Sequence, residues 1–211
     1  MRASVFGVAA VLCASGVASA AFVNGGFEAG NLSGWTVTPT GNGAASVQTV
    51  ELFDIDGPGA LGDSLAGKFS VGNAVSPNQG EQGIDLTQTL SLTGGVTYTF
   101  SFDWAAIRTT TSTNSQGGVF SVVVDGALFG TQAAGSTNSL TPHYGSISVD
   151  FTPGASGNYE VGARITRPFT IPGVGGAETL FQYVDNFDCV PAPSALGLLG
   201  LGALAGVRRR R

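Results

Sequence analysis

The chain is poor in lysine, histidine and cysteine. Of its 211 residues one is a lysine, Lys68, one is a histidine, His143, and two are cysteines. All 14 acidic residues lie between Glu28 and Asp188, with only four of the nine basic residues, so this stretch has a net charge of −10. An acidic surface of this kind does not hold nucleic acid or an anionic membrane by electrostatic attraction. It suits cations or neutral ligands.

The N-terminus carries the pattern of a secretory signal peptide. Arg2 precedes an apolar run, residues 5–12, and a small-residue stretch that ends at Ala20. We predict that residues 1–20 are removed on export by signal peptidase. Cys13 follows Leu12, where a lipidation site requires a small residue, so we expect no lipid anchor there. The exported part then keeps only Cys189, which excludes an internal disulfide.

The region between residues 21 and 190 lacks sustained helical periodicity and shows alternation of period two instead. The clearest example is 96–108, where Tyr98, Phe100, Phe102 and Trp104 share one face and are expected to face a core. Asp125-Gly126 between two apolar runs predicts a hairpin turn. Further strands are expected at 34–38, 45–50, 68–71, 84–92, 119–124, 127–131, 144–151, 159–166 and 179–190.

Nine or ten short strands in about 170 residues predict one all-β domain, residues 21–189. The expected architecture is a two-layer antiparallel β-sandwich of jelly-roll type, with a closed barrel as the alternative. The polar tract 108–118 and the Pro- and Gly-containing tract 166–178 are expected to be loops.

The last segment, residues 190–211, joins a short apolar run to a cluster of arginines. Residues 194–207 carry no charge and, as a helix, span only about 21 Å of a hydrocarbon core of about 30 Å. We predict a short C-terminal transmembrane helix whose terminal arginines stay on the cytoplasmic side. The arginines are Arg208, Arg209, Arg210 and Arg211. An ordinary membrane anchor is the alternative, since Gly202 and Gly206 have the spacing of membrane helix pairs.

The order Val190, Pro191, Ala192, Pro193, apolar helix and arginine cluster resembles the PEP-CTERM sorting signal of exopolysaccharide-producing Gram-negative bacteria. Ala192 stands where that family has a glutamate. The resemblance implies recognition by an exosortase-like sorting enzyme after passage through the export machinery. It also implies transient anchoring in the inner membrane through the C-terminal helix, then delivery to the cell surface or extracellular matrix.

A second resemblance begins with residues 22–35, which read FVNGGFEAGNLSGW. Together with the strand around Tyr98, the hairpin at 124–126 and the late stretch 183–187, they are similar to carbohydrate-binding, galactose-binding-like jelly rolls. The resemblance implies a structural Ca²⁺ held by Glu28 and Asp185, with carbonyl oxygens near Gly30 or Asn31 as neutral ligands. Carboxylate and carbonyl oxygens are the ligands that Ca²⁺ takes. In the alternative interpretation the two carboxylates are ordinary turn residues.

Two short motifs are interpreted as incidental. The acidic stretch 54–57 resembles the start of a calcium loop, but its twelfth position is Leu65 rather than Glu, so we expect an acidic turn. Residues 62–65 match the first block of the GDSL hydrolases, in which Ser64 would be the nucleophile. Leu140 stands where that family places an aspartate three residues before its histidine, here His143. We therefore predict no catalytic residue.

Three aromatic residues are candidates for stacking on a sugar ring. Trp35 and Trp104 follow strand alternation and are expected in the core. Tyr144, beside His143 and Gly145, is expected in an exposed turn and is the better candidate for contact with a ligand. The ligand-binding residues otherwise stay unassigned.

The sequence therefore predicts an exported, non-enzymatic surface or matrix protein that binds or organises polysaccharide. A purely structural surface protein without a ligand site is the alternative, and a GDSL-type hydrolase is a remote one.

Overall fold

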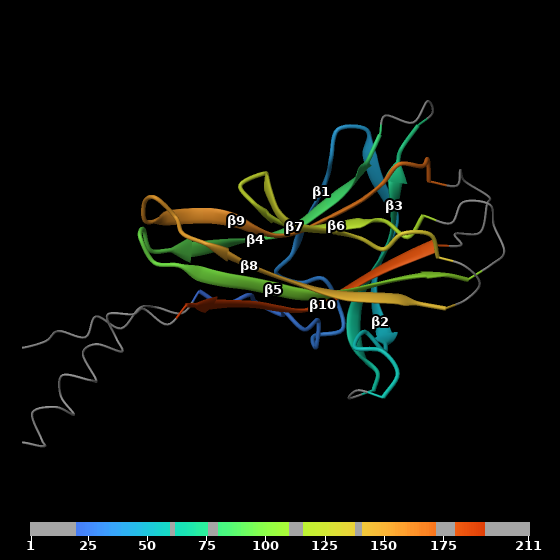
Figure 1. Ribbon diagram of the computed structural model, residues 1–211, viewed down its shortest axis with the longest axis horizontal. Helices are drawn as coiled ribbons and strands as arrows, with labels where there is room; N and C mark the ends of the chain where they lie inside the picture. Colours follow the sequence, from blue (N-terminus) through green and yellow to red (C-terminus); the bar gives the residue numbers. More distant parts are fainter. Residues whose placement is uncertain are drawn as a thin grey trace, which may run out of the picture.

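Two antiparallel sheets make up the domain (Figure 1). The structure is a computed structural model, and it describes residues 20–59, 62–75, 80–109, 116–137, 141–171 and 180–192. The strands are β1 (Thr36–Pro39), β2 (Gly43–Phe53), β3 (Ser64–Asn73), β4 (Gln82–Leu92), β5 (Tyr98–Arg108), β6 (Val119–Val124), β7 (Ala127–Ala133), β8 (His143–Phe151), β9 (Gly157–Arg167) and β10 (Leu180–Pro191).

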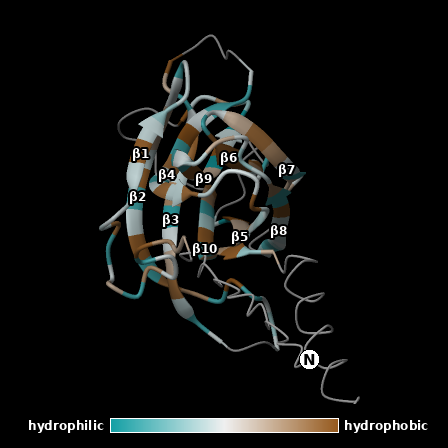
Figure 2. Cartoon of the chain, turned by 90° about the vertical axis from the view of Figure 1, so that its left-hand side faces the viewer, coloured by the Kyte–Doolittle hydropathy of each residue, from teal (hydrophilic) through white to brown (hydrophobic). Residues whose placement is uncertain are grey.

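One sheet has the order β1-β4-β9-β6-β7 and the other β2-β3-β10-β5-β8, as Figure 2 shows. From β3 onward the chain distributes its strands between the sheets in the order of a jelly roll. The prediction of a two-layer antiparallel sandwich is confirmed, because the sheets stay separate rather than closing into one barrel. No helix within the described ranges is long and apolar enough to cross a membrane.

Each of the ten predicted strands is present, and most are longer than predicted. The hairpin at Asp125-Gly126 is confirmed, since β6 and β7 pair up to Val124 and Ala127. Asp125 and Gly126 both have positive φ values, 45° and 82°, as the tight hairpin turn requires.

The core lies between the sheets and is built from the predicted alternation. Tyr98, Phe100, Phe102 and Trp104 of β5 are all at most 4% exposed. Trp104 stacks on Phe120 of the opposite sheet with ring centroids 4.6 Å apart. Trp35 is also buried, so the predictions for both tryptophans are confirmed.

The segment before β1 closes one end of the sandwich with aromatic rings. Phe22 and Phe27 stack against Trp35, with ring centroids 5.3 and 5.6 Å away. Phe187 of β10 contacts Trp35 at 4.5 Å. The turn that precedes β1 is therefore packed directly against β10.

Candidate functional site

A second group of aromatic side chains lies on the outer face of the sheet β2-β3-β10-β5-β8, away from the core. Strand alternation sends every second side chain outward, here Phe53 of β2, Tyr144 of β8, and Phe181 and Tyr183 of β10. Phe53 stacks on Tyr183 with centroids 3.8 Å apart and 12° between the ring planes. The ring centroids of Phe53 and Tyr144 are 6.5 Å apart. We call this surface the outer face.

An ion pair lies beside these rings. The Lys68 ammonium donates to Glu51 at 3.0 Å and lies 4.1 Å from the centre of the Phe181 ring. The Tyr183 hydroxyl donates to the other Glu51 oxygen at 2.6 Å. Burial alone would raise the pKa of Glu51, but the hydrogen bonds from Tyr183 and Lys68 outweigh burial and lower it. Glu51 therefore stays ionised and neutralises the only lysine of the chain.

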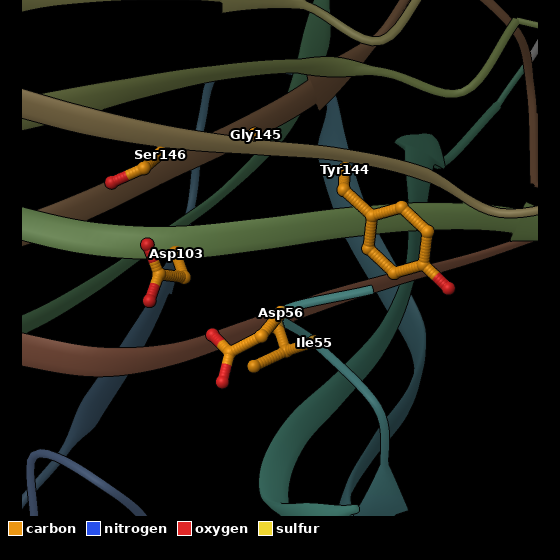
Figure 3. A pocket seen from close by; sticks show the side chains of 6 residues that line it. All are labelled: Ile55, Asp56, Asp103, Tyr144, Gly145 and Ser146. Carbon is orange, nitrogen blue, oxygen red and sulfur yellow. The ribbon is translucent and has the colours of Figure 1, made fainter. Parts of the chain in front are cut away.

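Next to the aromatic group lies an open hollow of about 200 Å³ (Figure 3). Three separate parts of the chain meet in it, namely the turn after β2, the middle of β5 and the start of β8. Its lining residues are Ile55, Asp56, Asp103, Tyr144, Gly145 and Ser146. Figure 3 shows the carboxylates of Asp56 and Asp103 at one end of the hollow and the ring of Tyr144 at the other.

Tyr144 lies on β8, as the predicted strand at 144–151 requires, and pairs with Ala105. The prediction that it lies in an exposed turn is wrong, since its side chain is half-buried. Gly57 lies against its ring, because a Cβ at Gly57 would be 3.4 Å from a ring carbon. Burial, together with the charge of Asp54, raises the pKa of the Tyr144 hydroxyl. The acidic turn 54–57 is therefore part of the wall of the hollow. The interpretation of that turn as incidental was incomplete.

Hydrogen bonds through the exposed Gln132 of β7 link the buried Trp104 to the backbone of β8 beneath the hollow. The Trp104 indole donates to the Gln132 side-chain oxygen at 2.9 Å, and the Gln132 amide donates to the Ser146 carbonyl at 2.8 Å. Gly145 passes directly over the indole, where a Cβ would collide with the Trp104 ring. Glycine at this position lets the backbone of β8 lie directly against the Trp104 ring, and this sets the position of the neighbouring Tyr144.

Asp103 is oriented by an irregularity in β10. The pairing of β10 with β5 shifts register between Asp185 and Asp188, and the inserted Asn186 takes a positive φ of 54°. Its side-chain amide donates to Asp103 at 2.9 Å. Bulges of this kind redirect side chains next to binding sites.

The proposed calcium ligands Glu28 and Asp185 lie near one another, on either side of Gly26. A Cβ at Gly26 would be 3.8 Å from the Asp185 Oδ1 atom and 3.8 Å from Glu28 Cγ. Asp185 is 1% exposed, and its Oδ2 accepts from the Ser64 hydroxyl at 2.8 Å. Burial raises the pKa of Asp185 to about 6, although Asn186 and Ser64 oppose the shift, and the charges of Glu28 and Asp103 raise it further.

The donor set at this position fits a calcium ion in part. The Asp185 Oδ1 atom is buried without a hydrogen bond of good geometry, so it has a free anionic oxygen to offer. No third acidic, histidine or cysteine side chain of the described segments joins the pair. Among the suggested neutral ligands, the Asn31 carbonyl accepts a hydrogen bond from Asn24 at 2.8 Å. Carbonyl or water oxygens would have to complete the site.

Only the beginning of the predicted sorting signal falls within the described residues. Val190 and Pro191 belong to β10 and pair with β5, and the Ala192 N–H donates to the Thr97 carbonyl at 2.8 Å. The last strand therefore runs past the predicted domain boundary at residue 189. Pro193 and Arg208 to Arg211 lie outside the described residues, as do residues 1–19 of the predicted signal peptide and most of the two predicted loops.

Ser64 and His143, the residues of the hydrolase alternative, are far apart in the sheet. Ser64 begins β3 and His143 begins β8, with β10 and β5 between the two strands. The Ser64 hydroxyl donates a hydrogen bond to Asp185, while the His143 ring nitrogen Nδ1 is 2.6 Å from the Ala134 carbonyl oxygen. His143 is therefore not placed to act as the general base that the GDSL hydrolase alternative requires at Ser64.

Together the fold and the outer face define an antiparallel β-sandwich with an open hollow on the outer face of one sheet. No family model and no curated protein matches the chain. Among solved structures, it is similar to the carbohydrate-binding module TmCBM61 in complex with β-1,4-galactotriose, at 16% identity and a TM-score of 0.49, over 82% of this chain and 100% of that one. It is also similar to the CBM22-2 xylan-binding domain of Paenibacillus barcinonensis Xyn10C, at 16% identity and a TM-score of 0.44, over 80% and 98%.

Part of an enzyme is similar as well. The arabinose-bound α-L-arabinofuranosidase MgGH51 matches at 18% identity and a TM-score of 0.47, over 83% of this chain and 27% of that one. These identities and scores are too low to carry a ligand from one protein to another. The case for a ligand of this chain rests on its own outer face.

Proposed function

We propose that the domain binds polysaccharide on the outer face, in and around the hollow beside Tyr144. The observation that supports this most is the open hollow, lined by carboxylates, a serine and the half-buried ring of Tyr144. The other aromatic rings of the outer face support the wall of the hollow, since Tyr183 is only 3% exposed and packs with Phe53 and Phe181 in a second small core. A sugar ring has apolar C–H faces that pack on an aromatic ring and hydroxyl groups that donate to carboxylates. Such a mixture of apolar wall and few polar groups is typical of small-molecule sites.

Binding to an array of neutral, acidic and amino-containing glycans tests this proposal. The full-length protein should be used, in a detergent without a sugar head group so that the detergent does not occupy the face. We expect saturable binding to at least one polysaccharide class. Absence of binding to every class would contradict the proposal and favour a purely structural role.

We further propose that the protein is exported and sorted by its C-terminal segment, on the support of the sequence pattern at residues 190–211. Replacing Arg208, Arg209, Arg210 and Arg211 by serine should release or missort the protein, because the short apolar helix loses its cytoplasmic stop. Fractionation of cells into membrane, surface and medium measures the effect. Four lysines in place of the arginines serve as the control, since they keep the charge. Unchanged fractionation of the serine variant would contradict this part of the proposal.

A structural calcium ion at Glu28 and Asp185 is the third part of the proposal. It is supported by the nearness of both residues to Gly26 and by the unpartnered oxygen of Asp185. The ion would supply positive charge to two carboxylates that otherwise repel one another. It would thereby tie the first turn of the domain to its last strand.

A further inference from the structure

The hollow carries more negative charge than the domain itself neutralises. Asp56 and Asp103 line it, and Asp54 lies close enough to raise the pKa of Tyr144. Asp56 is exposed, and no hydrogen bond or ion pair within the described ranges uses its carboxylate. One oxygen of Asp54 is buried and has no hydrogen-bond partner. These carboxylates have acceptor capacity that the protein leaves unused.

No cation of the described segments reaches the hollow. Lys68 is paired with Glu51 and lies on β3, two strands away from the β5 strand that carries Asp103, or roughly 10 Å at the usual strand spacing. That distance exceeds the Debye length of about 8 Å at physiological salt. Arg164 is paired with a carboxylate on the other sheet, while Arg108 and Arg167 are buried. The negative charge of the hollow is therefore not compensated by a basic side chain of the described residues, and a cationic ligand would be attracted to it.

The remaining lining suits one sugar ring. Tyr144 offers an aromatic surface, which attracts the C–H groups of a pyranose and also a cation placed over the ring. Ser146 adds a hydroxyl that both donates and accepts. The volume of about 200 Å³ is smaller than the roughly 300–1,000 Å³ of sites for drug-sized molecules. Uronic acids and sulfated sugars would be repelled by Asp56 and Asp103.

From this geometry we infer that the hollow binds an amino sugar with a free, protonated amine, as one unit of a partly or fully unacetylated polysaccharide. The ammonium donates to the Asp56 and Asp103 carboxylates while the sugar ring lies against Tyr144. A neutral sugar leaves the negative charge of the two carboxylates uncompensated. An ammonium group neutralises that charge and donates charge-assisted hydrogen bonds to both carboxylates. The inference rests on the proposed polysaccharide-binding function and names the ligand class of the same face.

A matched pair of probes tests the inference, namely a tetrasaccharide of β-1,4-linked glucosamine and its fully N-acetylated counterpart. Both have the same rings and linkages, and only the first carries charged amines below neutral pH. Calorimetric titration of the full-length protein, with a chelator present to exclude divalent metals, should show preference for glucosamine on the order of tenfold or more. The preference should shrink as salt is raised, because screening weakens exposed charge pairs.

Two substitutions with the same change in net charge separate the hollow from the rest of the surface. Asp56→Asn should remove most of the preference for glucosamine. Asp150→Asn should leave it intact, because Asp150 lies on the same strand as Ser146 but bonds to Thr99 at 2.7 Å, away from the hollow. A thermal melt of each variant confirms that it is folded.

Each remaining outcome overturns a defined claim. Equal binding of both tetrasaccharides, or a preference that survives Asp56→Asn, overturns the amino-sugar inference but leaves polysaccharide binding in place. Binding of polylysine with the same dependence on Asp56 would show a general cation site and also overturn it. Failure to bind any glycan of the wider array contradicts the proposed function itself.

Discussion

Replacing Trp104 by alanine should lower the free energy of unfolding by about 3–5 kcal/mol, the usual cost of truncating a buried tryptophan. Trp104 is 4% exposed, stacks on Phe120 across the two sheets and donates to Gln132. Truncation would leave a cavity at the centre of the sandwich and an unpaired amide oxygen. Domains of this kind have a total stability of about 5–15 kcal/mol, so the variant should lose between about a fifth of that stability and all of it.

Urea denaturation followed by the fluorescence of the remaining Trp35 measures this effect. Trp104→Phe is the matched control, since it keeps an aromatic ring against Phe120 and loses mainly the hydrogen bond. It should cost clearly less than alanine. Because Gln132 also supports the Ser146 carbonyl, both substitutions should loosen the hollow and weaken ligand binding. Stability of Trp104→Ala within about 0.5 kcal/mol of the parent would contradict the role of this residue in the core.

Calcium should raise the melting temperature of the parent protein by roughly 5–10 °C. At one hundred times its dissociation constant a bound ligand adds about 2.7 kcal/mol, which corresponds to that shift for a domain of this size. Glu28→Gln and Asp185→Asn should each abolish most of the response. Asp150→Asn should not, because Asp150 lies on a different strand and bonds to Thr99.

The effect of Asp185→Asn should change sign when calcium is removed. With chelator present, the raised pKa means that the folded protein holds the Asp185 proton more tightly than the unfolded chain does. The contribution of this group to stability is therefore present at low pH and is lost as pH rises from about 4 to about 6. At neutral pH without calcium, Asp185→Asn should equal or exceed the parent in stability. A melting temperature indifferent to both calcium and chelator would end the calcium proposal.

Most strands were predictable because one residue in two is apolar along them, and that alternation is local. The strand at 96–108 shows this most clearly, since its four aromatic residues all face the core. The hairpin at Asp125-Gly126 was predictable for the same reason, because a two-residue turn depends on the conformation of its own residues. Strand ends were less certain, since they depend on the length of the neighbouring strands.

The outer face was not predicted, because its residues come from strands that are distant in sequence. Phe181 and Tyr183 alternate with core residues of β10, so β10 has apolar side chains on both faces, which was the one available signal. Tyr144 was assigned to a turn because a glycine follows it. Gly145 is instead required by the Trp104 ring, a contact between β8 and β5 that only the folded chain reveals.

The acidic turn at 54–57 was set aside because it lacks the spacing of a calcium loop. Its role depends on where β2 ends relative to β5 and β8, since Asp56 lines the same hollow as Asp103 and Tyr144. Sequence spacing does not contain that relation. By contrast, Glu28 and Asp185 were expected near one another from the family resemblance, and both lie beside Gly26.

The most direct test of the outer face compares two variants, Tyr144→Ala and Tyr159→Ala. Each is titrated in a calorimeter with a polysaccharide that the parent protein binds. Both substitutions remove a half-buried tyrosine, but Tyr144 lines the hollow, whereas Tyr159 lies on β9 of the other sheet and donates to the Ala155 carbonyl at 2.8 Å. If the outer face binds the ligand, Tyr144→Ala should weaken binding by at least roughly tenfold, and Tyr159→Ala should bind as the parent does. Parent-like affinity of a folded Tyr144→Ala protein, or an equal loss in both variants, would contradict the assignment of the binding site to this face.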